Sequence, residues 1–261
     1  MQHFNDKELE DIFTAHSEIQ HRYSELTVKI YLFTGRLQND RAIEFLSQGV
    51  SRRLGIVYRC LGNIFSIFPP NRIEILDRNG LLDVEINLHT FLINIYGIIE
   101  STGLALAYEN DLIGDESDNK LPVKKINLFK RRFRRLLNPN LCAYLQRNTI
   151  IQWYNEYVKN YRDALAHRIP PYIPPAALND EQARRYKLLE DEANRLRREG
   201  DFEQIEAIQT EQNSLGKANP LFVHSFSEEA KPLYLHPQLI ADFRTVEELI
   251  DTAISNFYCE C

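Results

Sequence analysis

The chain has 261 residues, of which 44% are hydrophobic and 26% are charged, and its formal net charge at pH 7 is -6. This length and composition are ordinary for a soluble globular protein with a proper core, arranged as one large domain or two small ones. The negative net charge excludes a surface that attracts nucleic acid as a whole, so any contact with nucleic acid must come from a local basic patch.

The N-terminus and the cysteines predict a protein of a reducing, cytoplasmic compartment. The first residues lack the basic start and apolar run of a signal peptide, and no uninterrupted apolar stretch reaches membrane-spanning length. Cys60 and Cys142 lie in apolar helical stretches and are predicted core residues, whereas Cys259 and Cys261 form a lone Cys-x-Cys pair. Zinc needs about four ligands and no second pair lies near, so we expect no metal site.

The first half of the chain predicts three long helices. Apolar residues recur at steps of three and four from about Asp6 to Leu37, which favours the first helix. Asn39 is a suitable cap for a second helix that runs to about Phe68, where two prolines follow. A third helix is predicted from about Asp83 to Tyr108. It is apolar on most sides, which indicates a central, buried position.

A polar loop from Glu109 to Pro122 separates these helices from the next group. Short helices are predicted at 124–137 and 139–147. A longer helix follows from Asn148 to His167, with its apolar and aromatic residues spaced as one broad face. The proline-rich run at 170–175 then stops it.

The last third predicts an excursion and a return. Two highly charged helical halves between Asn179 and Leu215 meet at Gly200 and predict an antiparallel helical hairpin. Two roles are open for this hairpin. It is either a solvent-exposed excursion without chemistry or a binding surface for a protein partner. Segments 220–226 and 232–235 alternate weakly and predict a small hairpin of strands, before a final helix from about Pro237.

The predicted fold class is therefore all-α, with an inserted charged hairpin and a minor β-hairpin. We expect a helical core at residues 1–177 and the charged hairpin at 178–217. Residues 218–261 are expected to pack back on that core.

The most informative motif closes the helix 148–167, where Arg162-Asp163 is followed four residues later by His167. Arginine carries a permanent charge in a planar fork that fits phosphate, and histidine exchanges a proton near neutral pH. Positions five apart lie about 140° apart on an ideal helix, so Arg162 and His167 do not share a face. Asp163 and His167 do, and Asp163 is expected to orient the imidazole. The alternative is that both cations only cap the last carbonyls of the helix.

This pattern resembles that of the HEPN domains (higher eukaryotes and prokaryotes nucleotide-binding), many of which are ribonucleases. The resemblance covers about Asp83 to His167. It implies a metal-independent endoribonuclease without a cofactor, which leaves 2′,3′-cyclic phosphate and 5′-hydroxyl ends. His167 would be its general acid or base, and Arg162 would stabilise the phosphate charge. It also implies a homodimer with a composite site. Some toxin members carry a tyrosine two residues after the histidine, and this chain has Ile169 there.

The third predicted helix carries polar residues in apolar company. A buried glutamate needs a cation, and Arg162 is the predicted partner of Glu100. Asn94 is expected to line the same site. Buried polar groups need partners, so we interpret His89 and Asn87 as members of hydrogen bonds between helices.

A basic segment precedes the aromatic helix. Its apolar residues share a face that docks on the core, which leaves the basic ones outward as a predicted RNA-binding stripe. A solvated helix face is the alternative interpretation. The stripe consists of Lys130, Arg131, Arg132, Arg134 and Arg135.

Three functional hypotheses follow from the sequence. The first is an endoribonuclease with a toxin, defence or RNA-processing role, for which an antitoxin would be a protein partner. The second is a non-catalytic HEPN-like module that binds a nucleotide or RNA, and the third is a helical scaffold for a protein partner. For the first, we expect the aromatic helix to form part of the dimer interface, because Trp153 lies off its main apolar stripe.

Overall fold

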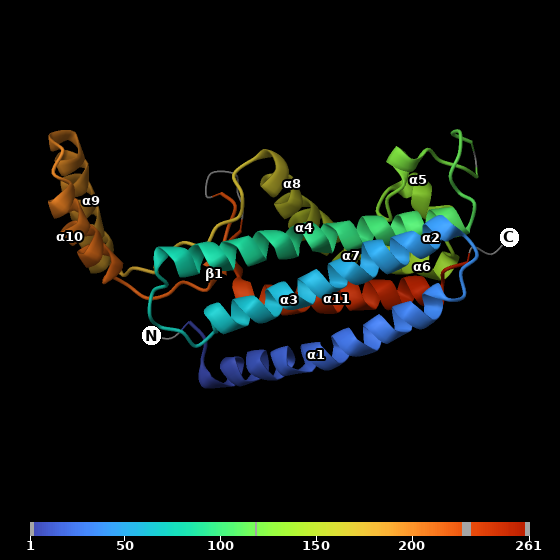
Figure 1. Ribbon diagram of the computed structural model, residues 1–261, viewed down its shortest axis with the longest axis horizontal. Helices are drawn as coiled ribbons and strands as arrows, with labels where there is room; N and C mark the ends of the chain where they lie inside the picture. Colours follow the sequence, from blue (N-terminus) through green and yellow to red (C-terminus); the bar gives the residue numbers. More distant parts are fainter. Residues whose placement is uncertain (1–2, 118, 226–230, 259–261) are drawn as a thin grey trace.

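The computed structural model describes residues 3–117, 119–225 and 231–258. Most of these residues are helical, which confirms the all-α class. Four long helical segments lie alongside one another and form the body of the protein (Figure 1). They are α1 (Asp6–Thr34), the continuous run of α2 (Asp40–Glu44), η1 (Phe45–Ser51) and α3 (Arg52–Ile67), α4 (Arg78–Glu109), and α11 (Leu235–Ser255).

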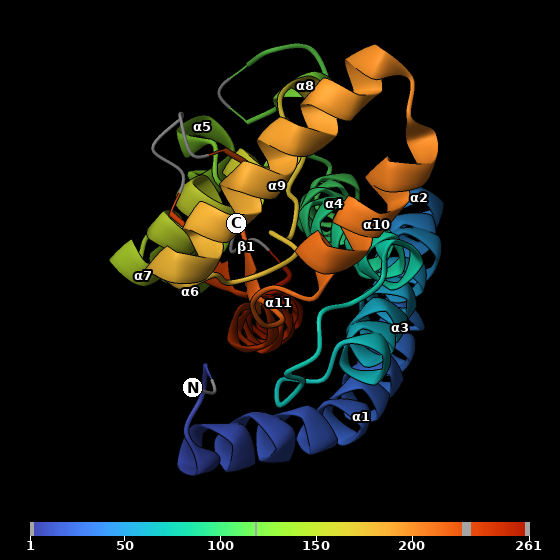
Figure 2. The same cartoon turned by 90° about the vertical axis from the view of Figure 1, so that its left-hand side faces the viewer.

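A second group of shorter helices covers one side of this body. Figure 2 shows α11 in the middle, with α1, α3 and α4 on one side of it and α6 and α7 on the other. Phe243 and Leu249 of α11 are fully buried, so this helix is the centre of the core. The shorter elements are η2 (Val123–Lys125), α5 (Arg131–Arg134), α6 (Pro139–Leu145), α7 (Asn148–Gln152), η3 (Trp153–Lys159) and α8 (Asn160–His167).

The helices begin where capping side chains stand. Asn5 accepts a hydrogen bond from the backbone N–H of Glu8, whose carboxylate accepts one from Asn5 in return. Asn39 accepts from two backbone N–H groups at the start of α2, as predicted. Asp77 caps α4 in the same way, which starts this helix five residues before the predicted Asp83.

The helix predicted at 124–137 is wrong in extent. The side chain of Asn127 accepts a hydrogen bond from the backbone N–H of Phe129 at 2.9 Å, and this local turn competes with a helix. Only η2 and the four-residue α5 remain helical. Phe133 and Leu137 still dock on the core as predicted.

The central position predicted for the third helix is only partly correct. α4 packs against α3, η1, α8 and α11, but Ile86 is 60% exposed and Ile93 is 40% exposed. By length and composition α4 is apolar enough to cross a membrane, and 72% of its most apolar window is buried inside the protein. Its hydropathy is therefore largely that of a core helix.

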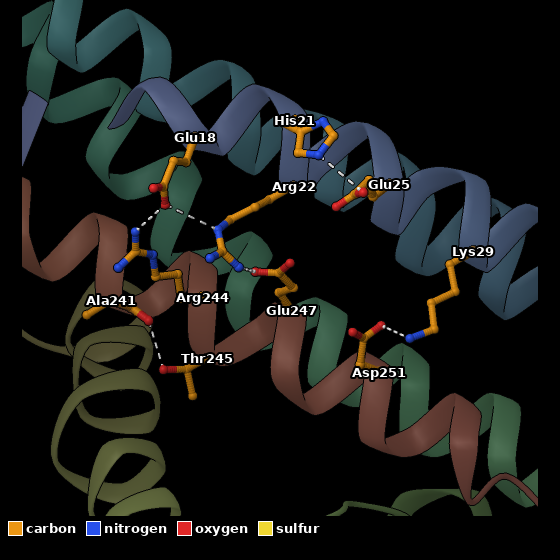
Figure 3. Close-up of polar contacts among 10 residues, drawn as sticks. All are labelled: Glu18, His21, Arg22, Glu25, Lys29, Ala241, Arg244, Thr245, Glu247 and Asp251. Carbon is orange, nitrogen blue, oxygen red and sulfur yellow. Dashed lines mark hydrogen bonds and ion pairs between the residues drawn. The ribbon is translucent and has the colours of Figure 1, made fainter. Parts of the chain in front are cut away.

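Ion pairs join α1 to α11 on the outside of the bundle (Figure 3). Arg22 pairs with Glu247 at 3.1 Å, and Lys29 pairs with Asp251 at 2.6 Å. Pairs this exposed stabilise a fold by about 1 kcal/mol or less each, so apolar burial holds the two helices together. Ile19, Leu26 and Ile30 of α1 supply that burial.

The charged hairpin forms as predicted and stands away from the bundle at one end (Figure 1). Its helices are α9 (Asp180–Glu199) and α10 (Phe202–Asn213), joined through Gly200 at φ 79°. Leu189, Leu196 and Ile205 are buried along its length. The chain returns to form β1 (Leu221–Phe222), which pairs antiparallel with β2 (Leu233–Tyr234) and confirms the minor β-hairpin. Cys259 and Cys261 lie outside the described residues.

Candidate active site at the end of the aromatic helix

The helix from Asn148 to His167 forms with its predicted bounds, but its middle is a π-helix. Residues Trp153–Lys159 take the wider turn, with α-helix before and after. Such turns are rare and often occur at functional sites. The wider turn changes which side chains face inward, so that Trp153, Tyr154 and Val158 are all buried.

Trp153 is therefore part of this chain's own core. Its indole N–H donates to the Oδ1 atom of Asp242 on α11 at 2.8 Å, and Gln238 donates to the same oxygen at 2.7 Å. The sequence argument that Trp153 lies off the stripe and is left for a dimer interface is wrong. An ideal α-helical projection does not contain the π-turn that rotates it inward.

Arg162 is held between two groups at the α8 end of this helix. Its Nη1 atom donates to Asp163 Oδ1 at 2.9 Å, and its guanidinium lies 4.7 Å from the ring centre of Tyr96 on α4. The hydrogen bond to Asp163 raises the pKa of Arg162 above its ordinary value, so the charge is permanent. The side chain is 32% exposed, and this hydrogen bond occupies one of its five donors.

Tyr96 belongs to a series of stacked side chains. Its ring is stacked with that of Tyr154, with the ring centres 6.3 Å apart. Tyr154 in turn stacks on Phe129, with the ring centres 3.8 Å apart and 7° between the ring planes. Asn127 donates to the Tyr154 hydroxyl at 3.2 Å. Burial raises the pKa of Tyr96 and of Tyr154, so both hydroxyls stay neutral and can donate hydrogen bonds.

This aromatic stack lines a cleft of about 490 Å³ between α4, η3 and the segment 123–134. The charged residues of the cleft are mostly cationic. The Nζ atom of Lys130 donates to the backbone oxygen of Lys124 at 3.1 Å, which holds it at the rim. The charged lining residues are Lys124, Lys130, Arg134, Lys159 and Glu100. The cleft thus joins flat aromatic faces to positive charge, although the protein as a whole is acidic.

His167 is exposed as the last residue of α8. The helix ends there because Arg168 adopts an extended backbone and Pro170 follows. Arg168 Nη2 turns back and donates to the backbone oxygen of Asn160 at 3.0 Å. Within the described residues, no hydrogen bond or ion pair restrains the imidazole of His167. Asp163, predicted to orient it, is paired with Arg162 instead.

The two predicted supporting residues lie in different places. Glu100 lines the cleft and is exposed, and its negative charge reaches Arg162 without forming an ion pair of 4 Å or less. Asn94 lies on the opposite side of α4, where it accepts from Arg53 at 3.0 Å. The structure therefore brings Arg162, Asp163 and Glu100 together and leaves Asn94 out.

The basic stripe is divided by the short α5. Arg132 pairs with Glu116, and Arg134 donates to the backbone oxygen of Leu145 at 3.2 Å. Arg131 and Arg135 are exposed. Lys130 and Arg134 are the members that reach the cleft. Sequence reasoning missed Tyr96, Tyr154 and Phe129 as a stack, because residues from three segments meet there and no single helical face contains them.

The hydrogen bond between helices predicted for Asn87 is confirmed, whereas His89 contacts a loop and not a helix. Asn63 on α3 donates to Asn87 at 2.9 Å, and a ring nitrogen of His89 contacts the backbone oxygen of Pro171. The second contact holds the proline run against α4, close to the end of α8.

No protein-family model matches this chain, and no curated protein or solved structure does so either. Among residues 3–117, 119–225 and 231–258, no three His, Cys, Asp or Glu side chains are grouped as a metal site requires.

Proposed function

We propose that this protein is a cytoplasmic endoribonuclease of the HEPN type, with RNA bound in the aromatic cleft and cleaved at the end of α8. One observation carries the proposal. Arg162 is fixed by Tyr96 and Asp163 beside a cationic cleft, while His167 at the same helix end is exposed and has no hydrogen-bond partner in the described part of the chain. A fixed cation and an adjustable acid–base group are the two elements that phosphodiester transfer needs.

The reaction proposed here needs no group beyond the RNA and the protein. The 2′-oxygen forms a bond to the neighbouring phosphorus, and the bond from phosphorus to the 5′-oxygen breaks. One proton leaves the 2′-hydroxyl and one reaches the 5′-oxygen, so a base and an acid are both required. The guanidinium of Arg162 would stabilise the extra negative charge on the phosphate oxygens.

A single helix end supplies only one histidine for these two proton transfers. A second copy of His167 across a two-fold axis would supply the other, which favours a homodimer with a composite site. Exposed apolar side chains near this end suit such an interface. Ile93 is 40% exposed on α4, and Ile169, just past the helix end, is 49% exposed.

RNA suits the cleft better than a protein ligand does. Stacking of a base on an aromatic side chain contributes about 1–3 kcal/mol, and lysines and arginines neutralise the backbone. The half-buried rings at the two ends of the stack, Phe129 and Tyr96, would provide the first kind of contact, and the rim cations Lys124 and Lys130 the second. A role in RNA processing, defence or as a toxin with an antitoxin partner is part of the proposal.

The test is RNA cleavage by the purified protein in excess EDTA. We expect products with 2′,3′-cyclic phosphate ends, and a loss of about 100-fold or more in His167→Ala and in Arg162→Ala. The melting temperatures of both variants should stay within a few degrees of wild type. His21→Ala is a matched control, because His21 is an exposed histidine on α1 that pairs with the neighbouring Glu25. Cleavage that survives His167→Ala would refute the mechanism.

A second candidate is RNA binding without cleavage. The pairing of Asp163 with Arg162 favours it, because the carboxylate offsets part of the charge that a transition state would use. This candidate predicts that RNA binds with wild-type affinity to His167→Ala and that no cyclic phosphate forms with any variant.

A further inference from the structure

A second cleft of about 490 Å³ opens on the other side of α4, facing α2, η1 and α3. It shares no lining residue with the aromatic cleft. Arginines from two elements converge on it, together with Glu44 and neutral polar side chains. The polar residues that carry the argument are Arg41, Arg52, Arg53, Gln48, Asn94 and Ser101.

Arg53 is built into this cleft. Its guanidinium lies over Gly97 of α4, where a β-carbon would come within 2.6 Å of the guanidinium carbon. A β-carbon at position 97 would therefore force the guanidinium to move from this place. Asn94 accepts from Arg53 Nη1 at 3.0 Å, and Asn94 in turn donates to the backbone oxygen of Thr90 at 2.7 Å. Because Asn94 is only 6% exposed and bonded at both ends, it fixes the orientation of the guanidinium.

The charges in this cleft are not balanced. Arg41 pairs with Glu44, but within the described residues neither Arg52 nor Arg53 has a carboxylate within 4 Å. Arg52 Nη1 donates to the neutral Gln48 at 3.4 Å. Arg53 is half-buried and Arg52 is exposed. A guanidinium bonded to a neutral amide keeps its full charge and most of its donors.

Neutral donors complete the cleft. Ser101 is 7% exposed, and its hydroxyl lies where a β-carbon on Gly49 of η1 would come within 2.9 Å. The π-turn therefore brings the η1 backbone close to this hydroxyl. A serine hydroxyl and two planar guanidinium groups around one space match the oxygens of a phosphate group.

We propose that this second cleft binds the phosphate of a nucleotide, with Arg52 and Arg53 as the groups that hold it. Its volume lies in the range of sites for nucleotide-sized ligands. The proposal goes beyond the ribonuclease proposal, because it uses neither Arg162 nor His167. A free nucleotide and an RNA backbone carry the same phosphate chemistry, and the test separates them.

The test is calorimetric titration of the full-length protein with ADP, pyrophosphate, adenosine and a single-stranded oligonucleotide. We expect ADP and pyrophosphate to bind and adenosine to fail, since it has no phosphate. Arg53→Gln and Arg52→Gln should each weaken ADP binding about tenfold or more, the effect of losing a hydrogen bond to a charged group. Arg59→Gln, an exposed arginine on the same helix, should leave binding unchanged.

Gly97→Ala keeps Arg53 but displaces its guanidinium, so it should also weaken ADP binding. This variant tests the same contact even if Arg53→Gln fails to fold. If only the oligonucleotide binds, and Arg53→Gln weakens it, the phosphate is that of the RNA backbone. If ADP, pyrophosphate and the oligonucleotide all fail to bind, or if wild type and Arg53→Gln bind them equally, the proposal is overturned. Titration of His167→Ala separates the two proposals, because ADP binding should be unchanged there.

Discussion

Two π-turns flank α4, and their difference shows how one backbone feature places two arginines in different surroundings. η1 interrupts the helical run 40–67, and η3 interrupts the run 148–167. In each run, an arginine two or three residues after the π-turn reaches α4: Arg53 after η1 and Arg162 after η3.

The residue that α4 offers decides what each arginine can do. Gly97 leaves room for the guanidinium of Arg53, and the neutral Asn94 leaves its charge uncompensated. Tyr96 gives Arg162 an aromatic face, and Asp163 offsets part of its charge. The first arrangement suits a compact phosphate, whereas the second suits a chain of stacked bases with a phosphate at its end.

The largest expected effect is on the pH dependence of stability, because the two π-turns are anchored differently. η1 is anchored by its own buried apolar side chains, Leu46 and Val50, whereas η3 is anchored by a hydrogen bond that Trp153 donates to Asp242. Burial raises the pKa of Asp242 from 3.8 to about 7. Well below pH 3.8 this group is protonated in both the folded and the unfolded protein, and its burial adds no cost that depends on pH. As the pH rises from 4 through 7, the unfolded chain ionises first and the folded protein loses stability.

Asp242→Asn should remove that loss, since it keeps an oxygen that accepts from Trp153 and Gln238. We expect the variant to be more stable than wild type by about 1–3 kcal/mol at pH 8 and equal to it at pH 4. Urea unfolding at both pH values measures the difference. His236, whose pKa burial lowers to about 4, acts in the opposite direction but is common to both proteins. An equal difference at both pH values would show that Asp242 does not titrate in this window.

Tyr96→Leu tests the stacked side of the comparison. It should weaken the binding of a single-stranded RNA by roughly 5- to 100-fold, because a base loses an aromatic face and Arg162 loses its support. Tyr31→Leu is the matched control, since Tyr31 is 78% exposed on α1. Fluorescence anisotropy with a labelled RNA gives both affinities. Equal losses in the two variants would contradict the placement of RNA at Tyr96.

Gly97→Ala tests the other side through stability. An alanine in a helix interior usually stabilises a protein by about 0.5–1 kcal/mol relative to glycine. Gly62→Ala on α3 should show this gain, because no atom lies within 4 Å of its added carbon. Gly97→Ala should lose the gain, since the Arg53–Asn94 hydrogen bond is displaced. Equal gains by chemical unfolding would mean that Arg53 is not fixed on Gly97.

The smallest expected effect concerns the cations around the aromatic cleft. Replacing Lys124, Lys130 and Lys159 by glutamine should reduce the salt dependence of RNA binding by roughly one unit of slope per lost phosphate contact. Arg132→Gln should change the slope less, because this arginine is paired with Glu116. Affinities measured between about 50 and 300 mM salt show which variant changes the slope more, since about one slope unit separates the two outcomes. A larger change in slope from Arg132→Gln would indicate that RNA binds along the basic stripe and not in the aromatic cleft.

Local patterns predicted the helices, their caps and the charged hairpin, because spacing and turn residues are properties of neighbouring positions. Gly200 and Asn39 are examples. The π-turns carry no such pattern, so the inward turn of Trp153 and the contact of Arg53 with Gly97 could not be predicted. Arg162 and His167 stood out by residue type, but the partner of Arg162 depends on how α4 packs. That packing is decided by contacts far apart in the chain.

The central claim is that the α8 end cleaves RNA by attack of a 2′-hydroxyl without a metal. The most direct measurement uses an RNA with one known cleavage site and its twin that carries a 2′-deoxyribose at that position, both in excess EDTA. The account predicts that wild-type protein cuts the first RNA to a cyclic phosphate end and leaves the second uncut at that site. Cleavage of the deoxy-substituted position, or cleavage only after a divalent metal is added, would contradict it.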